Sequence, residues 1–392
     1  MSVANEPVGG LLDGVALVDH HCHGVVNATL DRQRFELLAT EADRPAPPGC
    51  TGLDTQVGFA IRRWCAPAIG LEPNASPGDY LERRYALGAA EVNGRLLRAA
   101  GIGAFLVDTG YAPDDGLSPA QMAEAAGATA REVVRLEAVA ERVARDGATA
   151  RGFAAAYAEA LDLAASDAVG LKSVIAYRYG LDFDPEPPSA GEVRDAAGRW
   201  LRRVEGTSSP RLDDPVLLRH VLWAGVDRGL PVQFHAGFGD PDLDLDRCDP
   251  ARMTGFLRAV QRRQVAIMLL HCYPFHRQAG YLSQVFPHVY MDVGLAVNYT
   301  GARAAAVIAE SLELAPFHKV LFSSDAFGLA ELYYLGALLF RRAFDEVVGG
   351  WVAAGLWSAP DARRVARMVA AGNAERVYGL RVIGGTYVDR LR

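Results

Sequence analysis

The feature that most constrains the fold is a series of short apolar segments, rich in β-branched residues, that alternate with helical stretches. Each segment is nearly continuous in apolar character, which is typical of strands buried on both faces. The eight segments span residues 15–19, 103–108, 132–137, 169–177, 231–235, 265–271, 288–294 and 319–325. Alternating strands and helices predict an α/β fold with a parallel sheet, and eight such units predict a closed (β/α)8 barrel of the TIM type.

One stretch interrupts the alternation. Between about residues 27 and 97 the chain is helical in character and is broken by the proline-rich motifs PAPPG and EPNASPGDY. We interpret it as an insertion after the first strand that caps the barrel mouth, and a peripheral pair of helices is the alternative. Because α/β barrels often exceed ~250 residues as one unit, residues 1–392 are expected to form a single barrel domain, with a terminal helix after about residue 361.

The composition excludes several classes of protein. The net charge is −7 without a run of lysine and arginine, which argues against nucleic-acid and anionic-membrane partners. No apolar run reaches the ~18 residues of a transmembrane helix, and the first residues lack the pattern of a signal peptide. The five cysteines are widely spaced without a CxxC pair, which favours a reducing, cytoplasmic location. A small-molecule substrate is the expected partner, and self-association into a homo-oligomer is left open.

The strongest local signal is the motif Asp19-His20-His21-Cys22-His23 at the end of the first predicted strand. Residues two apart in a strand point to the same side, so His21 and His23 can direct two imidazoles at one point. That arrangement suits a divalent metal. An HxH motif alone is weak evidence, because pairs of surface histidines usually bind nothing.

Further ligand-type residues end other predicted strands. His235 ends the fifth, His271 the sixth and Asp325 the eighth. Residues at the carboxyl ends of barrel strands meet at one face, where active sites of this architecture lie. The order HxH, His, His, Asp therefore predicts a metal centre rather than isolated core histidines.

This order resembles the amidohydrolase superfamily, and the resemblance covers nearly the whole chain. Several segments are most similar to the amidohydrolase domain that is fused to glutamine synthetase in fungal developmental and plant nodulin-like proteins. These segments are GLKSVIAYRYGL, PVQFHAGFGDPDLDL, HCYPFHRQAGYLSQVFPHVYMDVGLA and VLFSSDAFGLAELYYLGA. No glutamine synthetase domain is expected within these residues.

The resemblance implies roles for the histidines and the aspartate at the strand ends. His21, His23, His235 and Asp325 are the implied metal ligands, and Asp325 also takes a proton from water whose pKa the metal lowers. Zinc is the expected ion, with one ion favoured over two. His271 is either a further ligand or, as we favour, the group that polarises the carbonyl or protonates the leaving group.

Lys172, within the fourth predicted strand, has two interpretations. Some superfamily members carry a carboxylated lysine there that bridges two metals. A free ammonium would instead suit a substrate carboxylate, and a lysine in a barrel-wall ion pair is the structural alternative.

Three weaker candidates for substrate binding follow the predicted strands. Arg178 could clamp a carboxylate through two hydrogen bonds, Asp240 could hold an amine, and Tyr273 could line the pocket. The alternatives are a surface arginine and a solvated acidic loop.

These residues predict a metal-dependent hydrolase that cleaves an amide bond. The link to glutamine synthetase suggests a γ-glutamyl amide or a similar carboxylate-bearing molecule as substrate. The first rival is a metal-dependent decarboxylase of an aromatic acid, and the second is a non-catalytic signalling barrel.

Overall fold

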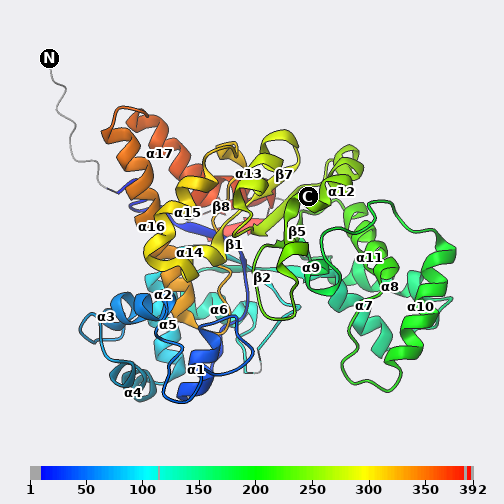
Figure 1. The fold of residues 1–392 in the computed structure, drawn as a ribbon, viewed down its shortest axis with the longest axis horizontal. Coiled ribbons are helices and arrows are strands. Elements are labelled where there is room, and N and C mark those ends of the chain that lie inside the picture. The colour runs from blue at the N-terminus through cyan, green and yellow to red at the C-terminus, as the bar shows by residue number, and fades with distance from the viewer. Residues whose placement is uncertain (1–9, 114, 384–385, 390–392) are drawn as a thin grey trace. The chain divides into compact units, whose positions relative to one another are not determined.

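The computed structural model describes residues 10–113, 115–383 and 386–389. The chain divides into two compact units (Figure 1). Unit 1 comprises the described residues of 1–107, 111–131 and 292–392, and unit 2 comprises residues 108–110 and 132–291. The insertion predicted for residues 27–97 therefore lies entirely within unit 1.

Unit 1 contains β1 (Leu17–Cys22), which pairs in parallel with β2 (Ile102–Asp108). On its other side, β1 is hydrogen-bonded to segment 320–328, which has no regular strand and only bridge residues at Val320 and Gly328. The bonds join His20 N to Phe322 O at 3.2 Å, Asp325 N to His21 O at 3.1 Å and His23 N to Ala326 O at 2.9 Å. The eighth predicted strand thus lies beside the first. Its ladder is irregular because a side chain, that of Asp19, accepts the hydrogen bond from Ser324 N.

Unit 2 contains four strands that follow β3 (Thr129–Arg135) and pair in succession, each parallel to the one before. They are β4 (Gly170–Ser173), β5 (Val232–Ala236), β6 (Ile267–His271) and β7 (Val289–Met291). All seven strands coincide with predicted ones, so the expected α/β architecture with parallel strands is confirmed.

The fourth strand is shorter than predicted. It ends at Ser173, and helix α9 (Ile175–Arg178) follows where the apolar pattern suggested a strand to residue 177. Two hydrogen bonds end the strand: Val174 N donates to Glu137, and Ile175 N donates to the Ser173 hydroxyl. The side chain of Glu137 thus overrides the β-propensity of the VIAY sequence.

The helices of unit 1 include α1 to α5, which belong to the insertion. Their bounds are α1 (Arg32–Leu38), α2 (Gln56–Ala60), α3 (Ala66–Ala68), α4 (Pro77–Leu87), α5 (Ala89–Ala99), α6 (Pro119–Ala126), α14 (Gly294–Thr300), α15 (Ala304–Ser311), α16 (Ala330–Ala353), α17 (Ala359–Arg367) and α18 (Asn373–Val377). Short π- or 3-10-helical segments connect some of them: η1 (Ile61–Cys65), η5 (Gly301–Arg303), η6 (Phe317–Lys319) and η7 (Met368–Gly372). The terminal helix predicted after about residue 361 corresponds to α17, η7 and α18.

The helices of unit 2 are α7 (Leu136–Arg145), α8 (Phe153–Ala164), α10 (Ala190–Val204), α11 (Pro215–Asp227), α12 (Thr254–Val260) and α13 (His276–Val285), with 3-10 segments η2 (Leu245–Cys248), η3 (Pro250–Met253) and η4 (Gln261–Arg263). Helices α7, α8, α10 and α11 pack against one another (Figure 1). Ser189 and Glu192 form a capping box at the start of α10, which satisfies backbone donors at that end. No helix among the described residues is both long and apolar enough to cross a membrane.

Buried polar contacts attach the insertion to the start of α16. Arg84 Nε donates to Glu331 Oε1 at 2.8 Å, and the Tyr80 hydroxyl donates to the same oxygen at 3.0 Å. Glu331 is fully buried and Arg84 is 4% exposed. Because α16 begins at Ala330, two residues after segment 320–328 ends, these contacts tie the insertion to the carboxyl end of that segment.

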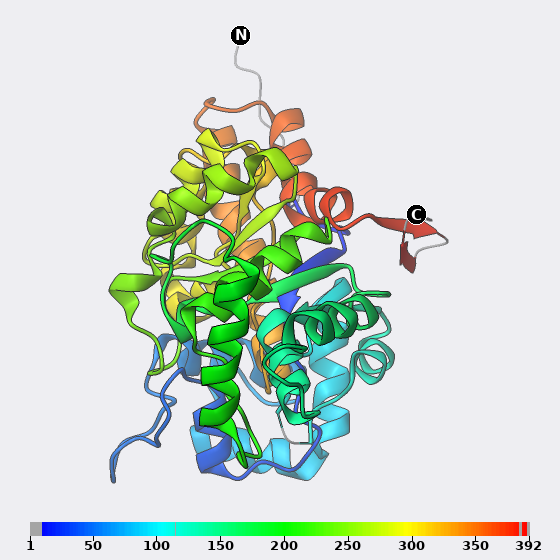
Figure 2. The same ribbon diagram turned by 90° about the vertical axis from the view of Figure 1, so that its right-hand side faces the viewer.

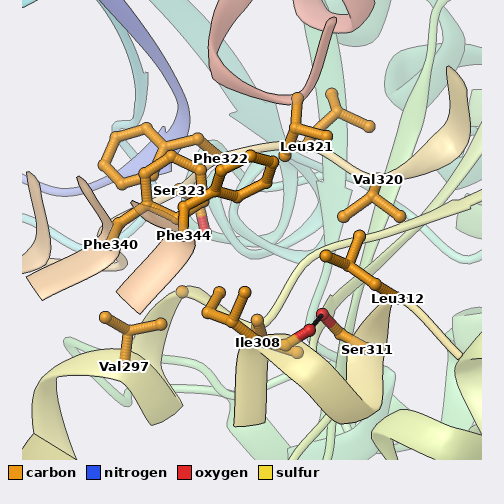
Figure 3. A pocket seen from close by; sticks show the side chains of 13 residues that line it. Val297, Ile308, Ser311, Leu312, Val320, Leu321, Phe322, Ser323, Phe340 and Phe344 are labelled. Atoms are coloured by element: carbon orange, nitrogen blue, oxygen red, sulfur yellow. Dashed lines mark hydrogen bonds between the residues drawn. The ribbon is translucent and has the colours of Figure 1, made fainter. Parts of the chain in front are cut away.

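A C-terminal hairpin and a small internal cavity complete unit 1. The C-terminal strands β8 (Leu380–Ile383) and β9 (Thr386–Asp389) form an antiparallel hairpin separate from the parallel strands (Figure 2). Between α14, α15 and α16 lies a cavity of about 10 Å³, with Phe322, Phe340 and Phe344 gathered on one side (Figure 3). That volume is at the lower limit for a single water, so this apolar site is core packing rather than a ligand pocket.

Replacing Glu331 with alanine should destabilise the protein strongly, because it leaves the Arg84 charge buried without its partner. The expected loss is about 3–5 kcal/mol in the free energy of unfolding, measured by urea denaturation. Glu91→Ala is the matched control: Glu91 also pairs with an arginine, Arg95, but both side chains are well exposed. That change should cost less than about 1 kcal/mol. Equal effects of the two substitutions would contradict the structural role of the buried pair.

Candidate metal centre

His21 and His23 lie side by side at the carboxyl end of β1. Their ring centroids are 5.0 Å apart and the rings meet edge to face. Both side chains are buried, with His21 fully enclosed and His23 9% exposed. The alternation of side chains along a strand explains this pairing, since the intervening Cys22 points into the apolar core beside Leu106.

Asp325 completes a three-residue group in unit 1. Its Oδ1 atom lies 3.2 Å from His21 Nε2 and 3.6 Å from His23 Nε2. Two ligands bound at ~2.1 Å to one tetrahedral ion are separated by roughly 3.4 Å, so both spacings suit a shared ion. The structure therefore brings together three of the four residues that the sequence assigned to the metal.

The chemistry of this group also fits a divalent ion. Two imidazole nitrogens and one carboxylate oxygen are the donors found in catalytic zinc sites, which keep a further position for water or substrate. Tyr111 packs against the ring of His23 at 5.7 Å and is itself 50% exposed. This tyrosine marks a side of the group that faces solvent.

Within unit 2, His235 and His271 lie on the neighbouring strands β5 and β6. Their ring centroids are 4.8 Å apart, and the ring of Tyr177 lies 4.4 Å from that of His235. Gly237 allows the loop after β5 to approach the loop after β6 closely. A Cβ atom at residue 237 would lie 2.3 Å from Tyr273 O, and the φ of +84° suits glycine. The sequence thus predicted correctly that both histidines end adjacent parallel strands.

His235 is buried, and a positively charged side chain acts on it. Burial holds the pKa of His235 well below its ordinary value, and the charge of Lys172 lowers it further. The ring is therefore neutral at pH 7, the form in which an imidazole nitrogen can bind a metal. Among the described residues, no hydrogen-bond partner reaches its buried Nε2 atom. A buried nitrogen without a partner is unusual and is what a ligand position requires.

Lys172 is buried on β4, where its register partners are Arg135 on β3 and Gln233 on β5. The positive charge of Arg135 is balanced by Asp108, because Arg135 Nε and Nη2 donate to Asp108 Oδ2 at 3.1 and 2.6 Å. Lys172 thus lies on the strand that pairs with β5, which carries His235.

The weaker candidates have local partners within unit 2. Arg178 donates from Nη2 to Glu141 Oε1 at 3.2 Å. Asp240 is exposed and accepts a hydrogen bond from Asp242 N. Tyr273 stacks on His276 at 5.6 Å and meets the edge of Phe238 at 5.9 Å. Each of these residues therefore has a local contact within unit 2, and the exposed position of Asp240 agrees with the solvated acidic loop that was the alternative.

Two residues next to the candidate ligands had received no role from the sequence. Tyr177 lies against His235, and Asp19 lies below His21 on the same face of β1. Burial raises the pKa of Asp19 to about 8, although its hydrogen bonds from Ser324 oppose this shift. The two-residue spacing from His21 was the available signal for Asp19, whereas nothing in the sequence places Tyr177 beside His235.

Comparison with known proteins relates this arrangement to one family. Residues 98–380 match the family described as amidohydrolase. Protein fluG of Emericella nidulans is 33% identical over 243 residues, which make up 59% of this chain and 27% of that protein. The match thus spans about a quarter of the length of this curated relative.

Solved structures extend the similarity to nearly the whole chain. A Lactobacillus casei protein described as a candidate metal-dependent hydrolase superposes with a TM-score of 0.83 and 28% identity, over 95% of this chain and 98% of that one. Uronate isomerase from Thermotoga maritima superposes with a TM-score of 0.61 and 13% identity, over 94% and 95% of the two chains. The second similarity is one of fold alone.

We expect His21→Ala and Asp325→Ala to lose most of the bound metal, because each removes one donor from the group in unit 1. Metal content is measured by mass spectrometry on protein purified from zinc-supplemented cells. His318→Ala serves as a control, since His318 lies outside this group on η6, and it should retain wild-type zinc. Wild-type metal content in both site variants would exclude these residues as ligands.

Proposed function

The chain belongs to the amidohydrolase family, and we propose that it is a metal-dependent hydrolase that cleaves a carbon–nitrogen bond in a small molecule. The observation that carries this proposal is the contact of one Asp325 oxygen with both His21 and His23. It joins a carboxylate to an imidazole pair at the carboxyl end of a parallel strand, where α/β enzymes of this type carry their chemistry.

We propose that His21, His23 and Asp325 hold one zinc ion and that His235 is a further ligand. The order of these residues in the sequence and the unpartnered Nε2 atom of His235 support its assignment. When bound, such an ion supplies Lewis-acid chemistry: it acidifies water and polarises a carbonyl oxygen.

The protein's own residues provide proton transfer. A carboxylate oxygen of Asp325 is the base that accepts the proton of the attacking water, and the solvent-facing side at Tyr111 admits that water. An imidazole nitrogen of His271 donates a proton to the departing amine, which would otherwise leave as a poor, negatively charged group. Amide hydrolysis needs both transfers, and the two side chains end different strands.

The proposed substrate carries a carboxylate. Lys172 and Arg178 are the cations on β4 and α9 that could neutralise it, and Arg178 retains a buried Nε atom without a hydrogen-bond partner among the described residues. The similarity of several segments to amidohydrolase domains fused to glutamine synthetase suggests a γ-glutamyl amide, whose free carboxylate would need such a cation. Tyr273 and Asp240 are proposed to contact the rest of this molecule.

The proposed architecture is the closed (β/α)8 barrel, with the insertion covering its mouth. The hydrogen bonds between β1 and segment 320–328 support closure between the first and last strands. The contacts of Arg84 and Tyr80 with Glu331 support a position of the insertion near the carboxyl end of that segment.

Asp325→Asn should abolish most of the activity, because an amide can neither accept the proton nor bind the metal as a carboxylate does. General acid–base catalysis typically contributes ~10²–10⁴-fold, so kcat should fall by at least that factor. The assay is a screen of γ-glutamyl amides and aromatic acids with metal content measured in parallel. Near wild-type turnover with metal retained would exclude Asp325 as the base, and carbon dioxide as product would make the enzyme a decarboxylase.

Arg178→Ala should raise KM about tenfold for acidic substrates and leave neutral amides unaffected, because a charge-assisted hydrogen bond contributes ~1.5–3 kcal/mol. Arg194→Ala is the control, since Arg194 is exposed and pairs with the neighbouring, exposed Asp195. An equal change for acidic and neutral substrates would place the carboxylate-binding group elsewhere.

A further inference from the structure

We propose that Asp19 and Ser324 are positioning residues that hold Asp325 in its ligand conformation before any metal is bound. This inference rests on the proposed function, because it concerns how the chain prepares the same site. It assigns a purpose to a buried hydrogen-bonded pair that the catalytic scheme does not use.

The backbone of Asp325 needs external support. Its φ angle is +48°, in the left-handed region that residues with a side chain rarely adopt. Such a conformation is unfavourable in a free chain and persists where surrounding contacts determine it. His271 and Cys272 share this property, with φ angles of +64° and +59°, so two candidate site residues lie in the same unusual region.

Hydrogen bonds fix the backbone on the N-terminal side of Asp325. Ser324 N donates to Asp19 Oδ1 at 2.9 Å, and Asn298 Nδ2 donates to Ser324 O at 3.1 Å. The amide of Asp325 itself donates to His21 O at 3.1 Å. The peptide groups before Asp325 are therefore tied to β1 and to α14.

The Ser324 hydroxyl connects the two sides of this turn. It is hydrogen-bonded to Asp19 Oδ2 and also accepts a bond from Ala326 N at 3.1 Å. One side chain thus links the strand that carries His21 to the residue after Asp325. Rotation of the Asp325 backbone towards an ordinary conformation would break these bonds together.

The opposite face of the same segment is anchored separately. The Ser323 hydroxyl donates to Asp292 Oδ1 at 2.9 Å, and Asp292 Oδ2 lies 2.9 Å from His20 Nε2. A Cβ atom at Gly294 would lie 2.0 Å from Ser323 Oγ, so only glycine permits this approach. Ser323 therefore fixes the position of the segment relative to Asp292 and Gly294. Ser324 fixes the backbone conformation at Asp325.

Burial gives these bonds their strength. Asp19 and Ser324 are fully buried, so water does not compete for their donors and acceptors. Outer partners of metal ligands typically change metal affinity by ~10–100-fold when they are removed. A pair that only stabilised the fold would change the melting temperature without changing the affinity for metal.

The test measures Zn²⁺ affinity of the full chain by competition with a chromophoric chelator. Ser324→Ala and Asp19→Ala should each weaken binding ~10–100-fold. Asp19→Asn should retain most of the wild-type Zn²⁺ affinity, because the asparagine amide oxygen can still accept the hydrogen bond from Ser324 N. The control is Ser311→Ala, which also removes a buried hydroxyl but one that bonds to Ile308 O within α15.

Two further readouts separate positioning from folding. The visible spectrum of the Co²⁺-loaded protein should change in Ser324→Ala and stay as in the wild type in Ser311→Ala. Thermal melts of the metal-free variants should show similar losses for both serine changes. Wild-type Zn²⁺ affinity and Co²⁺ spectra in Ser324→Ala and Asp19→Ala would overturn the inference alone, whereas a wild-type protein that binds no Zn²⁺ would overturn the proposed function as well.

Discussion

The hydrogen bonds between β1 and segment 320–328 are the interaction on which the candidate site depends. They place the end of one strand beside the end of another, so that Asp325 meets His21 and His23 although about 300 residues separate them in the sequence. Parallel pairing makes this possible, because strands that run in the same direction end at the same edge. The same bonds set a register in which His21 O receives the amide of Asp325.

The sequence predicted the parts of this arrangement that follow from periodicity. Seven predicted strands appear as strands, since continuous apolar runs are a direct consequence of burial on both faces. The eighth appears as an irregular segment that is hydrogen-bonded to β1. The spacing of His21 and His23 predicted their shared side for the same reason. His235 and His271 were placed correctly at strand ends because the apolar pattern stops there.

The sequence did not predict what depends on contacts between distant residues. The early end of β4 results from Glu137 on α7, whose carboxylate accepts a hydrogen bond from Val174 N. The partner of Arg178 is Glu141, one helix away, and the pairing of Asp19 with Ser324 joins residues that are 305 positions apart in the sequence. Propensity and periodicity describe local preference, whereas these polar pairs become visible only when the strands are placed side by side.

The buried polar groups around Asp325 explain why so unfavourable a backbone conformation is stable. Each buried carboxyl and hydroxyl group would be costly without partners, yet Asp19, Ser323 and Ser324 all have hydrogen bonds in directions set by β1, α14 and Asp292. Because satisfied groups of this kind resist rearrangement, the polypeptide itself holds Asp325 Oδ1 close to His21 and His23. Folding therefore supplies the geometry, and under the proposed function a metal ion would add its binding energy to a site that already exists, unlike small zinc domains in which the ion must also drive folding.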